Sequence, residues 1–286
     1  MSGDDDHVYL SLAEGHDDSD ARWAFGTGFE DPLHGVETAV PEGVDGAVLA
    51  ASCIALGDDA LVLAQRLAEW VTRAPELEEE VALANIGLDL LGQTRLLYSR
   101  AGQVDGTGRG EDAYAYFRGP DEFRNVRLVE VPNGDFAFSI GRLLVFASWR
   151  LAQFGELAGS ADPVLAAIAA KGVKELTYHR QYAAEWAVRL GDGTDESRAR
   201  MTAALVALTP CLAELFRAHD ARDAVLGDLG QVLTAAGLEL PEPDPDSNPE
   251  PNPLPGDGRL GGHTEYLAPL LGELQGLARA HPEATW

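Results

Sequence analysis

The chain has 286 residues, of which 45% are hydrophobic, and its formal net charge is −26 at pH 7. This length and apolar content are enough to build a large buried core, whereas the negative charge opposes electrostatic binding of nucleic acids. The sequence contains no apolar run of about 18 residues and begins with an acidic stretch, so we expect neither a membrane-spanning helix nor a secretory signal, and we expect a cytoplasmic protein.

The cations are unevenly divided between the two basic residue types. Lys171 and Lys174 are the only lysines among the 21 Lys and Arg residues. An acidic, lysine-poor composition is typical of proteins from salt-loving organisms, because high ionic strength screens the repulsion between surface carboxylates. Cys53 and Cys211 lie in apolar helical patterns and are interpreted as buried thiols of a reducing compartment.

Residues 1–44 are acidic, rich in glycine and aspartate, and without helical or strand periodicity. We expect a partly disordered extension there, followed by a single helical domain over residues 45–286. The first predicted core helix spans residues 45–71, where apolar residues recur at helical spacing. A short turn leads into the second helix, so the two are expected to be antiparallel neighbours.

The second predicted helix places Pro75 in its first turn, where a missing N–H costs little. It ends near Gly102, which is a plausible C-cap. Between these limits the helix is apolar on almost every face, which predicts that it is buried on almost every face. A glycine-rich, charged connection over 103–134 then crosses to the other end of the bundle.

The later helices begin at recognisable caps. Asp135 precedes a third helix over 136–157, whose apolar run is interrupted by Arg142. Asp162 caps a fourth helix that ends near residue 190, and Thr194 caps a fifth over 195–218. A sixth helix follows to about residue 236.

The C-terminal part begins with a proline-rich linker over 241–262 and continues as a helix over 263–280. Strand-like alternation is essentially absent from the sequence, so the predicted fold class is all-α. The glycine-rich stretch 102–110 follows no strand and lacks the Lys-Ser/Thr of a phosphate-binding loop. His263 is interpreted as part of a helix start.

Polar residues at spacing four cross two of the predicted apolar helices. The second helix carries Asn85, Asp89 and Gln93, and the fourth helix carries Lys171, Glu175 and His179. Residues four apart share one helix face, and buried polar groups need partners. The two lines are therefore predicted to face each other as a polar seam inside a helical bundle.

Four-helix bundles that hold two metal ions place Glu-x-x-His motifs on two of their helices. This chain offers Glu69, Asp89, Glu175 and His179 as candidate ligands, but neither seam helix has the required spacing: Gly92 lies three residues after Asp89, and Tyr178 lies three residues after Glu175. We therefore predict no metal site. The alternative use of the seam is charge compensation, with Lys171 pairing with Glu175, and with Arg142 or a lysine neutralising Asp89 or Glu69.

Several long motifs in one order carry a resemblance over residues 54–286. They are LGDDALVLAQRLAEW (56–70), PELEEEVALANIGLDLLGQTRLLY (75–98), FRNVRLVEVPNGDFAF (123–138), AAIAAKGVKELTYH (166–179), RLGDGTDES (189–197), GGHTEYL (261–267) and ELQGLARAHPEATW (273–286). With them the chain resembles the structural, PaaC-type subunits of multicomponent phenylacetyl-CoA epoxidases. The resemblance implies a ferritin-like helical bundle with additional C-terminal helices.

The resemblance also implies a role and partners. In such complexes a paralogous catalytic subunit holds a di-iron centre and converts phenylacetyl-CoA into a ring 1,2-epoxide, with electrons from NADPH through a reductase subunit, and further small subunits are present. The subunit that this chain resembles pairs with the catalytic one and carries no iron. Where the paralogue has its two Glu-x-x-His motifs, this sequence has Leu90 with Gln93 and Leu176 with His179.

We therefore predict no catalytic, cofactor-binding or metal-binding residue in this chain. Two other functions remain open from the residues alone. The first is a di-metal oxygenase, active in its own right, that uses Glu69, Asp89, Glu175 and His179. The second is a homo-oligomeric helical scaffold without an oxygenase partner.

Overall fold

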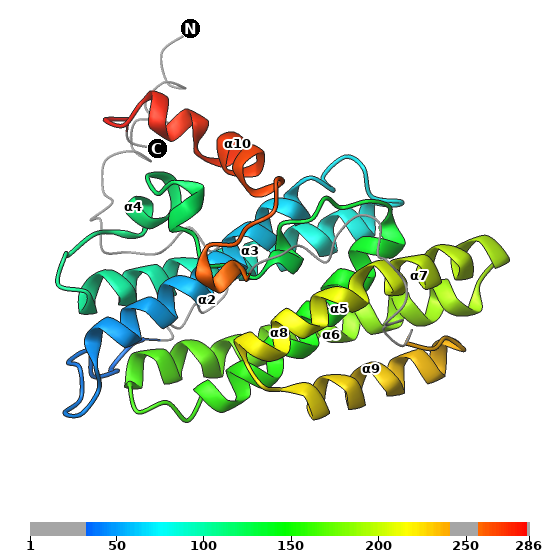
Figure 1. Cartoon of the computed structure of the whole chain (residues 1–286), viewed down its shortest axis with the longest axis horizontal. Helices are drawn as coiled ribbons and strands as arrows, with labels where there is room; N and C mark the ends of the chain where they lie inside the picture. Colours follow the sequence, from blue (N-terminus) through cyan, green and yellow to red (C-terminus); the bar gives the residue numbers. More distant parts are fainter. Residues whose placement is uncertain (1–32, 241–256, 285–286) are drawn as a thin grey trace, which may run out of the picture. The chain divides into compact units, whose positions relative to one another are not determined.

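The computed structural model of the protein describes residues 33–240 and 257–284. The predicted extension up to residue 32 and most of the predicted proline-rich linker lie outside the described residues. The chain from Gly35 onward forms one compact unit (Figure 1). Within the described ranges the structure consists of helices, turns and loops without a strand, which confirms the all-α prediction.

Four long helices form the bundle: α2 (Gly46–Ala68), α3 (Leu77–Val104), α5 (Phe136–Leu157) and α6 (Pro163–Asp192). α2 packs along α3, and α5 packs along α6, so the bundle consists of two helical hairpins (Figure 1). α3 also packs against α6, which closes the bundle between the hairpins. One long crossover joins the two hairpins, and this is the connectivity of ferritin-like folds.

The predicted starts of the third and fourth helices are confirmed by their caps. The carboxylate of Asp135 accepts a hydrogen bond from the backbone N–H of Phe138 at 2.9 Å at the start of α5. Asp162 does the same for Leu165 at 2.8 Å at the start of α6. These side chains satisfy N–H groups that the first turn of a helix leaves without a partner.

Some predicted boundaries of α3 are wrong. Glu76 is the N-cap and the helix begins at Leu77, so Pro75 lies before the helix and not in its first turn. The helix continues past Gly102 to Val104. Gly102 is needed there for another reason: a Cβ atom would collide with the backbone carbonyl of Arg109, so the glycine allows the following loop to pass close to the helix.

The C-terminal half contains more and shorter helices than predicted. The stretch expected to be one helix is α7 (Asp195–Leu208), a 3₁₀ turn (Thr209–Cys211) and α8 (Leu212–Ala218), because Pro210 lacks the N–H that a continuous helix uses. α9 (Arg222–Ala236) follows and ends at a left-handed glycine. The last helix, α10 (Leu267–Ala280), begins four residues later than predicted.

The predicted glycine-rich connection is largely folded. It contains the short helix α4 (Glu111–Tyr116) and two 3₁₀ turns, Pro120–Glu122 and Arg127–Val129. Two adjacent carboxylates of α2 hold its backbone: Asp58 accepts from the N–H of Arg124, and Asp59 accepts from the N–H of Val126, each at 2.8 Å. The connection is therefore packed onto the first hairpin.

Two stretches of the described chain, 46–68 and 195–218, are long and apolar enough to cross a membrane by length and composition. In their most apolar windows, 67% and 50% of the residues are buried inside the fold. α2 also contains Asp58 and Asp59, both fully buried. Core helices of bundles have these properties, so the two stretches are accounted for by packing.

Candidate functional site

Two of the three polar residues of the α3 line meet the α6 line as predicted: Gln93 inside the bundle, and Asp89 at its edge, where the side chain is 40% exposed. Gln93 donates a hydrogen bond through Nε2 to Oε2 of Glu175 at 3.0 Å. Nε2 of His179 lies 3.0 Å from Oδ2 of Asp89, and a carboxylate can only accept this bond. Asn85, the third polar residue of the α3 line, is exposed and is not part of the buried seam.

A guanidinium group from α5 completes the centre of the seam. Arg150 is fully buried. It donates through Nε to Oε1 of Gln93 and through Nη2 to the backbone carbonyl of Leu56, each at 3.1 Å. Its Nη1 lies 3.7 Å from Oδ2 of Asp59, and its guanidinium stands 4.4 Å from the ring centroid of Phe154. Arg150 therefore connects α2, α3 and α5 at one point.

Burial lowers the pKa of Arg150 to about 10, because a charged group is costly in an apolar interior, and the nearby carboxylate of Asp59 opposes that effect. A pKa of about 10 leaves the group charged at neutral pH. A permanent cation thus lies among the polar groups of the bundle interior, where a buried charge needs a compensating partner.

A second cation compensates Glu175. Nζ of Lys171 contacts Oε1 of Glu175 one turn away on α6, which confirms the predicted pair. The side chain of Glu175 is 14% exposed and that of Lys171 is 35% exposed, so the pair connects the interior of the seam to the surface. Glu175 is shared between this lysine and Gln93.

The predicted neutralisation by Arg142 is indirect and concerns Glu69. Asn133 accepts a hydrogen bond from Arg142 and donates one to Glu69 at 3.1 Å, and the negative charge of Glu69 acts to raise the pKa of Arg142. Its guanidinium donates to the backbone carbonyl of Val131 at 2.6 Å and to the side chain of Asn133, and the contacts within the described chain do not join it directly to Asp89 or Glu69. Glu69 instead pairs with Arg66 at 2.7 Å. Burial lowers the pKa of Arg142 to about 9, and the neighbouring charge of Arg66 acts in the same direction.

These contacts separate the four candidate ligands of a di-metal site. Glu69 lies with Arg66, Asp89 with His179, and Glu175 with Gln93 and Lys171. Within the described residues, the one set of three or more potential ligands whose atoms lie close enough to share an ion is Glu76, Glu78 and Glu79 at the start of α3, which includes none of the four. A di-iron centre needs carboxylates and imidazoles that converge, so the donors of the seam do not fit one.

The sequence patterns did not single out Arg150 or the two adjacent aspartates of α2. The available signal was charge inside an apolar pattern. Asp58 and Asp59 interrupt the apolar run of α2, and Arg150 follows Trp149 in the apolar run of α5. Charged residues at such positions are rarely buried without a partner. The buried aspartates of α2 therefore predict a buried cation, and the buried arginine of α5 predicts a buried carboxylate. Which helix supplies the partner depends on the packing of the bundle.

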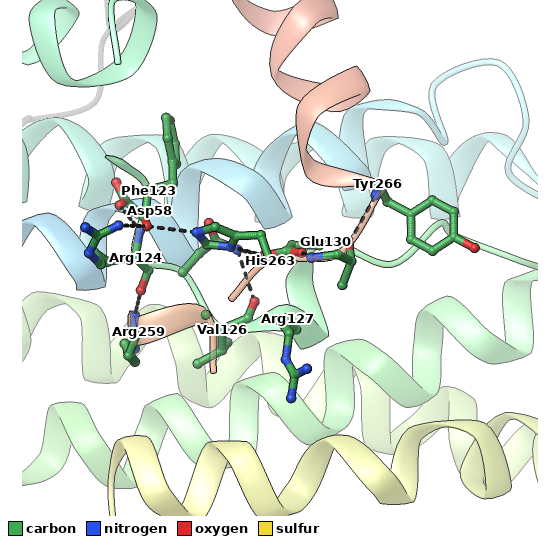
Figure 2. A network of polar contacts seen from close by, with 12 residues as sticks. Asp58, Phe123, Arg124, Val126, Arg127, Glu130, Arg259, His263 and Tyr266 are labelled. Carbon is green, nitrogen blue, oxygen red and sulfur yellow. Dashed lines mark hydrogen bonds and ion pairs between the residues drawn. The ribbon is translucent and has the colours of Figure 1, made fainter. Parts of the chain in front are cut away.

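A second polar network ties the C-terminal segment to the first hairpin and the crossover (Figure 2). Arg259 forms an ion pair with the buried Asp59 at 2.6 Å and donates to the backbone carbonyl of Arg124, also at 2.6 Å. His263 lies between Oε1 of Glu130 at 2.5 Å and the backbone carbonyl of Phe123 at 2.8 Å. Because Asp59 also faces Arg150, this network adjoins the seam.

Both ring nitrogens of His263 face acceptors, so the imidazolium form, with two N–H donors, satisfies the site best. Burial opposes this charge, but the hydrogen bond and negative charge of Glu130 and the carbonyl of Phe123 outweigh it, so the pKa of His263 is raised. The carboxylate of Glu130 also accepts from the N–H of Thr264 at 2.7 Å. His263 is therefore part of a charged clasp between distant segments.

The two cysteines are free. Burial raises the pKa of Cys53 to about 12 and that of Cys211 to about 11. Both thiols are therefore protonated near neutral pH and unsuited to act as nucleophiles or metal ligands.

Comparison with known proteins identifies the family. A family described as "Phenylacetic acid catabolic protein" matches residues 38–228, which include the whole seam. The chain is also 43% identical over 247 residues to one of the subunits of the 1,2-phenylacetyl-CoA epoxidase of Escherichia coli (strain K12), an alignment that covers 83% of this chain and 99% of that relative. The ferritin-like helical bundle, the motifs and these matches agree, and the chain belongs to the phenylacetic acid catabolic protein family.

Proposed function

We propose that this chain is a non-catalytic structural subunit of a di-iron phenylacetyl-CoA epoxidase complex. In this role it pairs with the iron-bearing catalytic subunit and supports it in aerobic phenylacetate degradation. The similarity to an epoxidase subunit extends over 99% of that relative, so it concerns a whole polypeptide of such a complex and not one shared segment.

The position of Arg150 is the observation that carries the non-catalytic role. Metal centres of ferritin-like bundles lie between the helices, where carboxylates from several helices converge. Here a buried guanidinium stands between α2, α3 and α5, hydrogen-bonded to Gln93 and facing Asp59. Lys171 adds a second cation at Glu175. Side-chain cations compensate the buried carboxylates, and a bound metal cation would compete with them for the same charge.

Cofactors and further partners follow from the same proposal. The chain itself carries no cofactor, and a paralogous partner subunit holds the two irons. That partner, with electrons from NADPH through a reductase subunit, forms the ring 1,2-epoxide of phenylacetyl-CoA. The contribution of this chain is to bury an apolar face of the partner and to hold its helices in place.

Iron analysis of two preparations tests the proposal. The chain is expressed alone and together with the catalytic subunit of the same source, both are purified in high salt, and iron is measured per polypeptide. We expect the chain alone to be iron-free and the co-purified pair to contain about two irons per catalytic subunit. Near-stoichiometric iron in the chain alone would favour a di-metal oxygenase, and a metal-free assembly of identical chains that ignores the partner would favour a scaffold.

We further propose a cytoplasmic, halophilic protein. The net charge of −26 produces a repulsion between surface carboxylates that salt screens. The melting temperature should therefore rise between 0.1 M and 2 M KCl, as differential scanning fluorimetry can measure. An unchanged melting temperature over this range would contradict the halophilic interpretation.

A further inference from the structure

Three carboxylates gather at the start of α3, outside the seam. Glu76 is the N-cap of this helix, and Glu78 and Glu79 lie in its first turn. Each offers one oxygen atom, and the three oxygen atoms all lie within 4.8 Å of one another. Glu79 precedes Asp89 of the seam by ten residues, which is about 15 Å along the helix axis, so this set and the seam are separate.

The acidity of this turn does not by itself require an ion. Acidic residues are common in the first turn of a helix, because the helix dipole places partial positive charge there. Glu76 and Glu78 are exposed and solvated. Glu79 differs from both, because it is 9% exposed and its Oε2 atom is buried without a hydrogen-bond partner in the described chain. A buried carboxylate without a partner is costly, so Glu79 points to a partner from outside the chain.

The neighbouring helix α6 does not neutralise Glu79. The negative charge of Glu79 acts on Tyr182 of α6, whose pKa is raised chiefly by burial, so this phenol is uncharged near neutral pH. Arg189 also acts on Tyr182, but its guanidinium stands over Trp186, 5.1 Å from the ring centroid. The ion pairs between described residues include none of the three carboxylates.

The ligand atoms and their separations indicate the kind of ion. Ca²⁺ binds carboxylate and water oxygens at about 2.3–2.6 Å, so two oxygens on one such ion lie at most about 5 Å apart. The limit of 4.8 Å in this set fits that range. Mg²⁺ binds at about 2.1 Å, which allows at most about 4.2 Å, and it usually takes one or two carboxylates. Iron and zinc favour imidazole or thiolate, and the set contains neither.

The charge of the set favours a divalent cation over a monovalent one. Three carboxylates carry three negative charges, and the start of a helix offsets only about half a charge. A divalent cation neutralises most of the remainder, whereas a monovalent one leaves the greater part uncompensated. The exposure of Glu76 and Glu78 lets water occupy the other positions around such an ion, as is usual for Ca²⁺.

The start of α3 also lacks the side-chain cap that the other long helices have. Aspartate side chains cap the starts of α2, α5 and α6, but the N-cap residue Glu76 makes no side-chain bond to the first turn. An ion shared by Glu76, Glu78 and Glu79 would join the N-cap to that turn. It would thereby fix the helix start as a capping side chain does.

We propose that Glu76, Glu78 and Glu79 form a structural site for a divalent cation of the Ca²⁺ class, with Glu79 as its buried ligand. The ion holds the N-cap and the first turn of α3 together and takes no part in redox chemistry. The sequence-based prediction of no metal-binding residue was argued from the seam, and this site lies outside it.

Calcium binding to the full-length chain tests the proposal. The protein is stripped with EGTA in high salt, which screens weak binding to its many surface carboxylates, and Ca²⁺ or Mg²⁺ is titrated by isothermal titration calorimetry. We expect one Ca²⁺ per chain, bound about 10-fold or more tightly than Mg²⁺. Glu79→Gln and Glu78→Gln should each weaken Ca²⁺ binding about 10-fold or more. Glu80→Gln removes the same charge from the same turn but outside the set, and should bind as the wild type does.

Melting temperatures with and without Ca²⁺ distinguish ion binding from a packing role of Glu79. In EGTA, Glu79→Gln should melt at or above the wild-type temperature, because the amide removes an unpaired buried charge. With Ca²⁺ present the order should reverse, since an ion that binds the folded chain stabilises the wild type. A packing role would lower the melting temperature of the variant equally in both conditions, which would contradict the proposal.

Two further results would overturn the inference. The first is a wild-type chain that binds no Ca²⁺ or binds Mg²⁺ more tightly. The second is equal Ca²⁺ binding by the wild type, Glu79→Gln and Glu78→Gln, which would assign the binding to other surface carboxylates. If Glu79→Gln does not fold, Glu78→Gln decides the question, because Glu78 is exposed and circular dichroism can verify that this variant is folded.

Discussion

Arg150 donates a hydrogen bond through Nε to the side-chain oxygen of Gln93, 3.1 Å away, between α5 and α3. Gln93 passes the connection to α6, because its amide nitrogen donates to Glu175 at 3.0 Å. Arg150 of α5 and Glu175 of α6 belong to the second hairpin, and the amide of Gln93, on α3 of the first hairpin, joins them. This relay connects the two halves of the bundle by polar contacts.

Arg150→Met should destabilise the isolated chain by about 3 kcal/mol, because it leaves Gln93 and the carbonyl of Leu56 without their buried donor. This loss of unfolding free energy lies in the lower part of the range that is usual for breaking a buried ion pair, because Asp59 keeps a second cation, Arg259. Chemical denaturation in high salt measures the difference. Arg180→Met, which removes a partly exposed pair with Asp228, is the matched control and should cost at most about 1 kcal/mol. If Arg150→Met and Arg180→Met lower the free energy of unfolding equally, the buried contacts of Arg150 contribute no more to stability than an exposed ion pair.

Lys171→Met should destabilise the chain by about 1 kcal/mol, since the mostly buried Glu175 then keeps only the amide of Gln93 as a partner. The exposure of Lys171 keeps this value small. Lys174→Met, three residues on in the same helix and exposed, should change the free energy of unfolding by less than about 0.5 kcal/mol. If Lys171→Met leaves both stability and assembly intact, charge compensation at Glu175 is not a function of this lysine.

The clasp at His263 should weaken as pH rises. Its pKa in the folded protein is raised above the ordinary value of 6.5, so the charged ring contributes stability that is fully present below pH 6.5 and is lost as pH rises through the folded pKa. Hydrogen exchange of residues 257–284 should therefore be slower at pH 6 than at pH 8, after correction for the intrinsic exchange rate.

His263→Gln is the control for this pH dependence. Glutamine has no titratable group, so the corrected difference in exchange between the two pH values should shrink in the variant. The positive charge of Arg124 acts to lower the pKa of His263 and is present in the wild type and the variant alike. A variant with the same pH dependence as the wild type would assign the effect to other groups.

Removing the candidate metal ligands of this chain should leave the iron of the complex unchanged. Glu175→Gln and His179→Gln each remove a strong ligand while retaining a group that can hydrogen-bond in the seam. With the catalytic subunit bound, elemental analysis should find the same iron content as in the wild-type pair. Loss of about half or more of the iron in either variant, with pairing intact, would place a metal site in this chain.

The starts of α5, α6 and α7 were predictable because their signals are local. Asp135, Asp162 and Thr194 each cap the helix that directly follows them, and capping depends on bonds that span only two or three residues. The break at Pro210 is equally local, since a proline lacks the N–H that a continuous helix uses. The contact between Glu175 and Gln93 was predictable from the spacing of four on both helices. This spacing places the polar residues of each helix on one face, and buried polar faces must pair with each other.

The occupant of the seam could not be predicted in the same way. Arg142 and Arg150 both interrupt the apolar pattern of α5. Arg150 lies at the centre of the seam and donates to Gln93, whereas Arg142 donates to the backbone carbonyl of Val131. The two arginines are alike in local sequence character, since both interrupt apolar runs of α5. What separates them is which groups α2 and α3 present at each level of the bundle.

Periodicity, capping residues and long motifs were sufficient to predict the all-α class, the starts of α5, α6 and α7, the facing of Gln93 and Glu175, and the family, because each of these signals is contained in a short stretch of the chain. The packing of the folded chain places Arg150 at the centre of the seam, binds Arg259 and His263 to the crossover, and leaves Leu77, Val81 and Leu88 of α3 exposed. The reason is physical: a charge in an apolar run predicts that it must be compensated, but the partner is chosen by the packing of helices that are distant in sequence.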